Sequence, residues 1–183
     1  MDLKFYRNVQ SAGSIAKQKT ANKKVQFKEK MGMALTTFGA IMGFAAEITG
    51  QAEDTYKVLF PKTHDLTLRE VLLALSAEGG KSHSLMEKTR RENVTEMILE
   101  PISGLHQEDY EIDLRITDLV EDTDLLKTAL ALEEREKKFF SDVSSKIPLP
   151  EVARIFRKLA QKKQDNLTKL QSLALNQALK RKT

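Results

Sequence analysis

Residues 129–160 read ALALEEREKKFFSDVSSKIPLPEVARIFRKLA, and this stretch decides the fold class. Its apolar residues recur every three or four positions, which is the spacing of one face of an α-helix. The prolines at 148 and 150 interrupt the pattern, because a proline ends a helix and restricts the residue before it. The stretch therefore predicts a helical hairpin, with one helix at 123–144 and the next at 151–180.

A second hairpin is predicted on the N-terminal side of this one, because helical spacing returns there. Its first helix covers residues 25–59 and ends at Phe60-Pro61-Lys62-Thr63-His64-Asp65, where proline breaks the pattern. Its second helix begins after Thr67, which resembles an N-cap followed three residues later by Glu70. This helix is expected to continue to about residue 99.

A long connection at residues 101–123, with a short helix expected at 112–119, separates the two hairpins. Among four-helix bundles, one long crossover between two hairpins is the ferritin-like arrangement, whereas up-down-up-down bundles use three short loops. The sequence thus predicts an all-α, ferritin-like four-helix bundle of two helical hairpins joined by a long crossover. We assign it to residues 25–183, after an arm at residues 1–24.

The composition excludes several classes of site. The chain has no cysteine, which rules out disulfide frameworks, thiolate nucleophiles and sulfur-ligated metals. It has no tryptophan and only 6% aromatic residues, and no Gly-rich phosphate loop, so we expect no nucleic-acid binding. The apolar stretch 33–48 is shorter than the ~20 residues that cross a bilayer, and no signal peptide precedes it. We expect a cytoplasmic protein.

The positive charge of the chain is concentrated at its N-terminus. The formal net charge is +4, but residues 1–30 carry eight Lys or Arg against two acids, which leaves −2 for the remainder. Within the arm the basic residues are Lys4, Arg7, Lys17, Lys19, Lys23 and Lys24. Phe5, Val9 and two alanines form a shallow apolar stripe there. Such a segment binds an anionic membrane surface or a partner's groove, or it remains a solvated terminus.

The two hairpins also match each other at an offset of 84 residues. Equal spacing places equivalent side chains at equivalent depths in each hairpin, as an ancient duplication would. The matching pairs are Tyr56 with Phe140, Leu75 with Leu159, and Met86 with Leu170. We expect both aromatic residues to be buried.

Residues 129–140 and 152–160 resemble the third and fourth helices of rubrerythrin-type, ferritin-like proteins. The shared features are a glutamate, Glu133, six residues before an aromatic pair, then a short turn, then Phe-x-x-Leu-Ala beginning at Phe156. The resemblance covers about residues 43–173 with the crossover as a gap, and it is closer in the second hairpin than in the first.

This resemblance implies six metal-ligand positions, because each hairpin in the family supplies one Glu and one Glu-x-x-His to two metal ions. The positions fall on Thr49, Gly79 and Ser82 in the first hairpin and on Glu133, Lys163 and Asn166 in the second. Only Glu133 keeps a ligand. The ammonium of Lys163 repels cations and is expected to pair with Glu133 inside the bundle. The resemblance therefore implies a lost di-iron site and no cofactor.

An alternative set of ligands lies within about one helical turn of these positions. It consists of Glu47, Glu53, Glu78 and His83, together with Glu133. A register slip that brings these side chains together would allow two iron or manganese ions to bind, and the chain would then be an oxidase or peroxidase of the rubrerythrin kind. The other interpretation is that they are solvated charges on helix faces.

The sequence therefore favours a non-enzymatic ferritin-like protein that acts as a protein-interaction or scaffold element. The pattern Gly39-Ala40-Ile41-Met42-Gly43 allows another backbone to approach closely, either within the bundle or in a homodimer. The alternatives are the di-metal enzyme and a peripheral membrane-binding helical protein that uses its basic arm.

Overall fold

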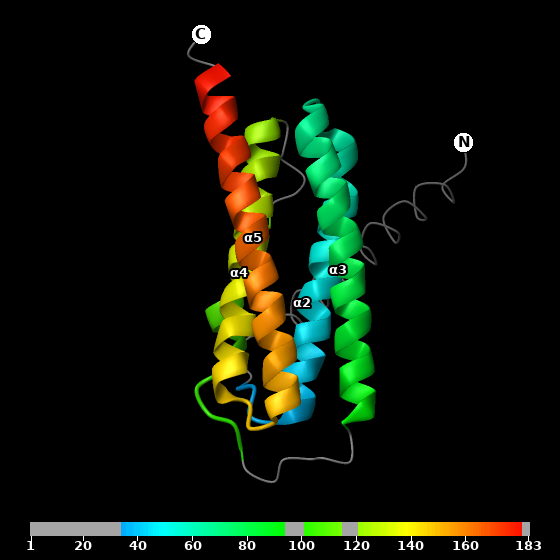
Figure 1. The fold of residues 1–183 in the computed structure, drawn as a ribbon, viewed down its shortest axis with the longest axis vertical. Helices are drawn as coiled ribbons and strands as arrows, with labels where there is room; N and C mark the ends of the chain where they lie inside the picture. The colour runs from blue at the N-terminus through cyan, green and yellow to red at the C-terminus, as the bar shows by residue number, and fades with distance from the viewer. Residues whose placement is uncertain (1–33, 94–100, 115–120, 181–183) are drawn as a thin grey trace, which may run out of the picture. The chain divides into compact units, whose positions relative to one another are not determined.

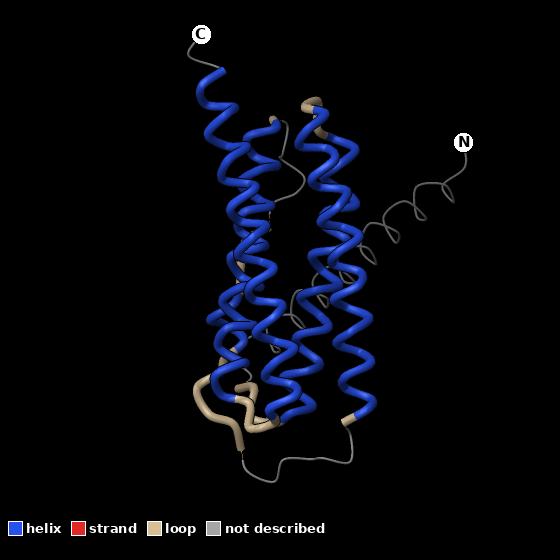
Figure 2. Tube along the Cα trace, in the orientation of Figure 1, coloured by secondary structure: helices blue, strands red, loops and turns tan. Residues whose placement is uncertain are grey.

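The computed structural model describes residues 34–93, 101–114 and 121–180. This part of the chain contains four long helices and no strand, as Figure 1 and Figure 2 show. The helices are α2 (Phe38–Leu59), α3 (Leu66–Glu92), α4 (Asp122–Lys146) and α5 (Pro150–Lys180), with 3₁₀ turns η1 (Phe60–Lys62) and η2 (Gln107–Tyr110). The prediction of an all-α chain with four long helices is confirmed. None of the described helices combines the length and apolarity that crossing a membrane requires.

Both helices of the first hairpin begin at other residues than the sequence predicts. Helix α2 begins at Phe38, because the Thr37 hydroxyl accepts a hydrogen bond from the Ala40 amide and caps the helix. Residues 34–37 therefore do not belong to the helix that was predicted to begin at residue 25. Residues 25–33 lie outside the described chain. Helix α3 is capped by Asp65 rather than Thr67, since the Asp65 carboxylate accepts from two amides of the first turn.

The connection between the hairpins also differs from the prediction. Helix α3 ends at Glu92, and residues 94–100 lie outside the described chain. Within the described part of the connection, the helical turn is η2 at Gln107–Tyr110. Residues 112–114 of the predicted helix 112–119 are not helical, and 115–120 are not described. The second hairpin agrees with the prediction to within two residues, because Pro148 and Pro150 mark its turn and Pro150 fits the first position of α5.

Short turns make α2 and α3, and likewise α4 and α5, antiparallel neighbours (Figure 1). Two apolar clusters fill the interior, and each receives side chains from all four helices. One cluster contains Ile41, Met86, Phe139 and Phe156 among others, and the other contains Tyr56, Leu72, Leu132 and Leu170. Because both clusters are shared, neither hairpin can bury its apolar faces alone.

Polar contacts fix the two ends of the bundle. At one end the Asp122 carboxylate accepts hydrogen bonds from the Thr63 hydroxyl at 2.6 Å, the His64 amide at 3.0 Å and the Asp65 amide at 2.9 Å. This places the turn between α2 and α3 beside the start of α4. At the other end, backbone bonds join Leu35 to Leu105 and Ile102 to Thr36, so residues 102–105 lie beside the start of α2.

The internal repeat has a structural counterpart. All six side chains of the three matching pairs are buried, and in each pair one member belongs to each apolar cluster. A twofold axis perpendicular to the helices would relate the two hairpins in this way. Such an axis places equivalent residues of the two hairpins toward opposite ends of the bundle, and so in different clusters. Only residues next to such an axis can meet their own equivalents. Two pairs separated by 84 residues do so: Arg135 donates to Gln51 at 2.5 Å, and Lys162 lies 3.2 Å from Glu78.

Helices α2 and α3 approach each other closely at Gly79, whereas the predicted small-residue pattern shows no such approach. A Cβ added at Gly79 would stand 3.1 Å from the Glu53 Cα, so α2 and α3 nearly touch there. A Cβ at Gly39 would meet nothing within 4 Å, and one at Gly43 would reach only the Arg90 guanidinium. The expectation of tight internal packing at Gly39 is therefore wrong.

Candidate functional site

Six polar side chains from all four helices meet in the interior, and we call them the buried cluster. They are Tyr56 of α2, Glu78 of α3, Glu133 and Glu136 of α4, and Lys163 and Asn166 of α5. Glu133, Glu136 and Lys163 are each 0% exposed. Because residues three apart on a helix share a face, α4 presents both of its carboxylates, and α5 both its ammonium and its amide, to the interior.

The Lys163 ammonium stands among three carboxylates. Its Nζ lies 2.6 Å from Glu136 Oε2, 3.1 Å from Glu133 Oε1 and 3.7 Å from Glu78 Oε1. Two of these partners come from α4 and one from α3, so the ammonium joins three helices. A buried charge is tolerated only when it is paired in this way.

Glu133 is better satisfied by hydrogen bonds than Glu136. The Tyr56 hydroxyl donates to Glu133 Oε1 at 2.7 Å, and Asn166 Nδ2 donates to Glu133 Oε2 at 3.0 Å and to Glu78 Oε1 at 2.9 Å. Neither oxygen of Glu136 accepts a well-directed hydrogen bond, although the Lys163 ammonium is its near neighbour. Glu136 is therefore held chiefly by the Lys163 charge.

The titration of the cluster follows from this arrangement. Burial raises the pKa of Glu136, as does the nearby Glu133 charge, and the attraction of Lys163 offsets this only in part. Burial alone would lower the pKa of Lys163, but the negative charges of Glu136 and Glu133 outweigh it and raise that pKa. Lys163 therefore remains an ammonium and cannot act as a nucleophile, which would require the free amine.

Tyr56 of the cluster and Arg135, which lies beside it, are also buried. Burial, and then the charges of Glu133 and Glu136, raise the pKa of Tyr56, so its hydroxyl stays protonated and acts as a hydrogen-bond donor. The Arg135 guanidinium, whose pKa burial lowers, bonds to Gln51 and to the Ile48 carbonyl and leaves its Nε without a partner. Both side chains tie α4 to α2.

The structure buries all six ligand positions implied by the resemblance. The predicted contact of Glu133 with Lys163 is confirmed, and Asn166 joins them. In the first hairpin, the Thr49 hydroxyl bonds to carbonyls of its own helix, Gly79 packs on Glu53, and Ser82 is buried without a metal-binding group. This donor set does not fit two iron ions, because it offers one carboxylate and places an ammonium beside it.

The alternative ligands are not brought to one place. Glu78 and Glu133 lie in the buried cluster, but the Glu53 carboxylate pairs with Lys57 at 2.7 Å, and Glu47 is exposed on α2. The His83 ring packs over Gly50. Among the described residues, no three carboxylate or imidazole groups form a set that could hold a metal ion. The residues of the basic arm, from Lys4 to Lys24, lie outside the described chain.

Sequence reasoning missed Glu136 and the role of Tyr56. Glu136 follows Glu133 by three residues, and this spacing was the available signal, since it puts both carboxylates on one face. The Tyr56 hydroxyl is the one polar difference from its repeat partner Phe140. That difference becomes informative only once the fold places Tyr56 against Glu133.

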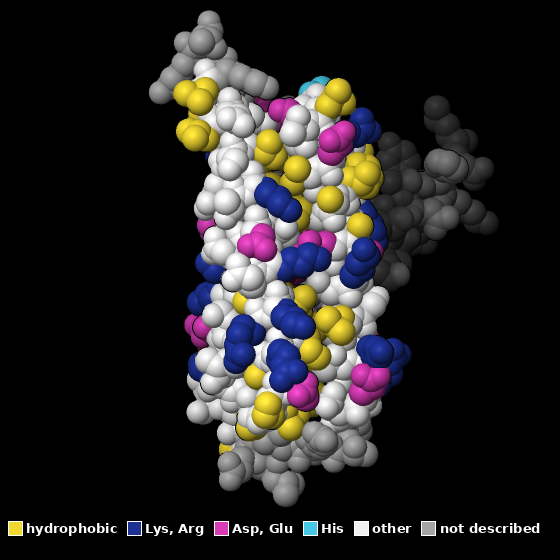
Figure 3. All heavy atoms as spheres, viewed as in Figure 1, with side chains coloured by type: hydrophobic (Ala, Val, Ile, Leu, Met, Phe, Trp, Pro, Cys, Tyr) yellow, Lys and Arg dark blue, Asp and Glu magenta, His cyan; other side chains and the backbone are white. Residues whose placement is uncertain are grey.

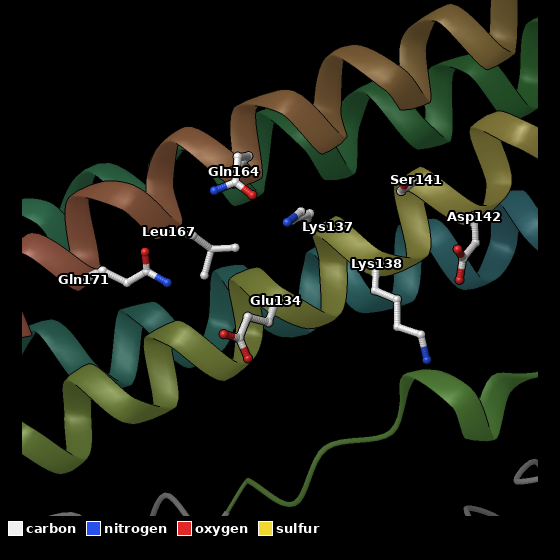
Figure 4. A pocket seen from close by; sticks show the side chains of 8 residues that line it. All are labelled: Glu134, Lys137, Lys138, Ser141, Asp142, Gln164, Leu167 and Gln171. Atoms are coloured by element: carbon white, nitrogen blue, oxygen red, sulfur yellow. The ribbon is translucent and has the colours of Figure 1, made fainter.

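The cluster is separate from the groove on the outer side of α4 and α5. Figure 4 shows the residues that line this groove, which are Glu134, Lys137, Lys138, Ser141, Asp142, Gln164, Leu167 and Gln171. None of them belongs to the buried cluster. The cluster residues of α4 and α5 contact one another and also Tyr56 of α2 and Glu78 of α3.

Comparisons with models of protein families, with curated proteins and with solved structures found no match to this chain. The resemblance to rubrerythrin-type proteins therefore stays a prediction that rests on the residues quoted above.

Proposed function

We propose that the chain is a non-enzymatic, ferritin-like protein that needs no metal and acts as a protein-interaction or scaffold element. The observation that carries this proposal is the position of Lys163. Its ammonium lies 2.6 and 3.1 Å from two carboxylates that are fully buried with it. This fixed internal cation offsets part of the negative charge of these acids, a role that bound metal ions would have in a di-metal protein.

The ferritin-like part of the proposal is supported by the contacts at the two ends of the bundle. Helix α3 runs away from the turn at Thr63–Asp65, and α4 starts beside that same turn, at Asp122. The connection between α3 and α4 must then return along the length of the helices, as a ferritin-like crossover does. The twofold relation of the hairpins supports the same topology.

The interaction role is supported by the outer surface. Four leucines are more than half exposed: Leu66 and Leu73 on α3, and Leu175 and Leu179 on α5. Figure 3 shows hydrophobic side chains gathered in the upper part of the viewed face, over both hairpins. Exposed apolar surface of this kind is typical of contacts with other macromolecules.

Elemental analysis tests the proposal directly. The full chain is purified without chelators from cells supplied with iron and manganese, beside a variant with Lys163→Glu and Asn166→His. We expect less than stoichiometric metal in both proteins, because Thr49, Gly79 and Ser82 supply no ligands in either. Two metal ions per natural chain would overturn the proposal and favour the di-metal oxidase or peroxidase.

The membrane alternative requires a second measurement. Sedimentation with vesicles that contain anionic lipid compares the full chain with a chain that lacks residues 1–24. We expect neither protein to sediment with the vesicles at physiological salt. Sedimentation of the full chain alone would assign the function to membrane binding through the arm, and would overturn the scaffold proposal.

A further inference from the structure

An acidic segment lies on the outer side of α4. Residues 107–114 read QEDYEIDL and contain no basic residue. The side chains of Glu108, Asp109, Glu111 and Asp113 are all exposed. The segment therefore presents up to four negative charges within six residues.

This acidic segment is held in a fixed position against α4. Tyr110 is buried in its middle, and the Tyr110 hydroxyl donates to the Asp142 carboxylate at 2.8 Å. The Lys138 ammonium donates to the Asp109 carbonyl at 2.9 Å and lies 5.2 Å from the centre of the Tyr110 ring. Because the segment is already ordered, a partner would bind it at little cost in conformational entropy.

A basic stripe of opposite charge runs along the outer face of α5. Arg154, Arg157, Lys158 and Lys162 are all exposed, and no acidic residue occurs from 152 to 164. Arg154 pairs with Glu151 at 3.5 Å and Lys162 with Glu78 at 3.2 Å, whereas Arg157 and Lys158 have no acidic partner in the described part of the chain. Figure 3 shows Lys and Arg side chains following α5 down the viewed face.

The acidic segment and α5, the helix that carries the basic stripe, lie on either side of α4. In Figure 4, α4 runs between α5 and the segment that contains η2, and Lys138 points toward that segment. The groove between α4 and α5 carries both signs of charge, with Glu134 and Asp142 beside Lys137 and Lys138. A surface with a positive side, a mixed centre and a negative side is complementary to itself after a twofold rotation.

We propose that this face binds a second copy of the chain, with the acidic segment of each copy on the basic stripe of the other. The proposal rests on the proposed function, since it names the partner of the interaction protein. A twofold dimer forms the contact twice, which a single acidic partner of another kind would not do. Exposed ion pairs are individually weak, so the dimer should be reversible and should dissociate as salt is raised.

Charge reversal tests the contact from both sides. One variant carries Arg157→Glu with Lys158→Glu, and the other carries Glu108→Lys with Glu111→Lys. By sedimentation velocity at low salt, we expect each variant alone to dimerise about 100-fold more weakly than the natural chain, because like charges then face each other. An equimolar mixture of the two should recover the dimer, since every contact in the mixed pair again joins opposite charges.

The matched control is Lys88→Glu with Arg91→Glu, which reverses two exposed charges on α3 outside the proposed face. It should dimerise like the natural chain, and circular dichroism should show equal helix content in all variants. A monomeric natural chain at low salt, a mixture that stays monomeric, or a control weakened as much as the variants would each overturn the dimer. The metal content of the same samples tests the proposed function separately, because a monomer without metal contradicts only the dimer.

Discussion

At the Lys163 ammonium, three carboxylates share one positive charge. Removal of that charge leaves buried acids without compensation, which costs ~3–5 kcal/mol. We expect Lys163→Met to lower the free energy of unfolding by about this amount in urea titrations. A loss below ~1 kcal/mol would show that the cluster contributes little, as is found for exposed pairs.

A second change should distinguish the two acids on α4. Glu133 retains the Tyr56 and Asn166 donors when Lys163 is removed, whereas Glu136 loses its main partner. We therefore expect Glu136→Gln to recover more of the stability lost in Lys163→Met than Glu133→Gln does. The sequence predicted Glu133 alone as the partner of Lys163, and equal recovery by both changes would contradict the assignment of Glu136 as its main partner. Double-mutant cycles measure the difference.

The cluster should also make stability depend on pH. Burial raises the pKa of Glu136 above its ordinary value of 4.5, so above that value the folded chain keeps a proton that the unfolded chain releases. The folded state then binds more protons, and the free energy of unfolding falls as pH rises through this window. The Glu136→Gln variant lacks this titrating group, so its contribution to the pH dependence of the free energy of unfolding is absent. Urea unfolding from about pH 4.5 to about pH 7 should show a shallower fall for the variant, and parallel curves would contradict the assignment.

The sequence could predict one contact of this cluster but not its full membership. Glu133 and Lys163 were paired because the resemblance to rubrerythrin-type proteins implies that both occupy metal-ligand positions in the second hairpin. Glu136 looks like any charged residue on a helix, and its burial depends on which face α4 turns toward α2. That orientation follows from packing across both hairpins, which no local pattern encodes.

At the scale of the elements, helix types were predictable because apolar spacing is strong in all four helices. The first residue of each helix was harder to predict, because several residues within a few positions can act as the N-cap. Thr67 has the sequence pattern of a capping box. The Asp65 carboxylate nevertheless accepts hydrogen bonds from the Thr67 and Leu68 amides, so α3 begins at Leu66. Asp65 is the N-cap rather than Thr67, because a charged carboxylate accepts stronger hydrogen bonds from these amides than a hydroxyl does.

The approach of α2 to α3 can be tested at two glycines. Gly79→Ala places a Cβ 3.1 Å from the Glu53 backbone, and we expect overpacking to cost ~1–3 kcal/mol, of which about 1 kcal/mol is offset by helix propensity. Gly39→Ala meets open space and should be neutral or stabilising by up to ~1 kcal/mol. Thermal unfolding compares them. Equal effects at both positions would show that the hairpin has room at Gly79.

At the scale of the whole molecule, the arm and the bundle should be separable. Deletion of residues 1–24 removes many basic charges but few large apolar side chains, so we expect the midpoint of thermal unfolding to stay nearly unchanged. Calorimetry at high salt, where the proposed dimer is dissociated, makes the comparison between monomers. A fall of more than ~5 °C would show that the arm packs on the bundle.

The twofold relation between the hairpins has a consequence for the order in which the chain folds. Each hairpin closes through a short turn, so its own contacts join residues that are near in sequence and form at a low cost in loop-closure entropy. The contacts beside the axis, such as Gln51 with Arg135, join residues 84 apart and can form only after the crossover has closed. We therefore expect two hairpins that assemble first and dock later. Lys163 can meet Glu133 and Glu136 within the second hairpin, whereas Tyr56 and Glu78 reach the cluster only when the hairpins dock. The buried cluster would then begin as a local pairing within one hairpin and be completed by the other.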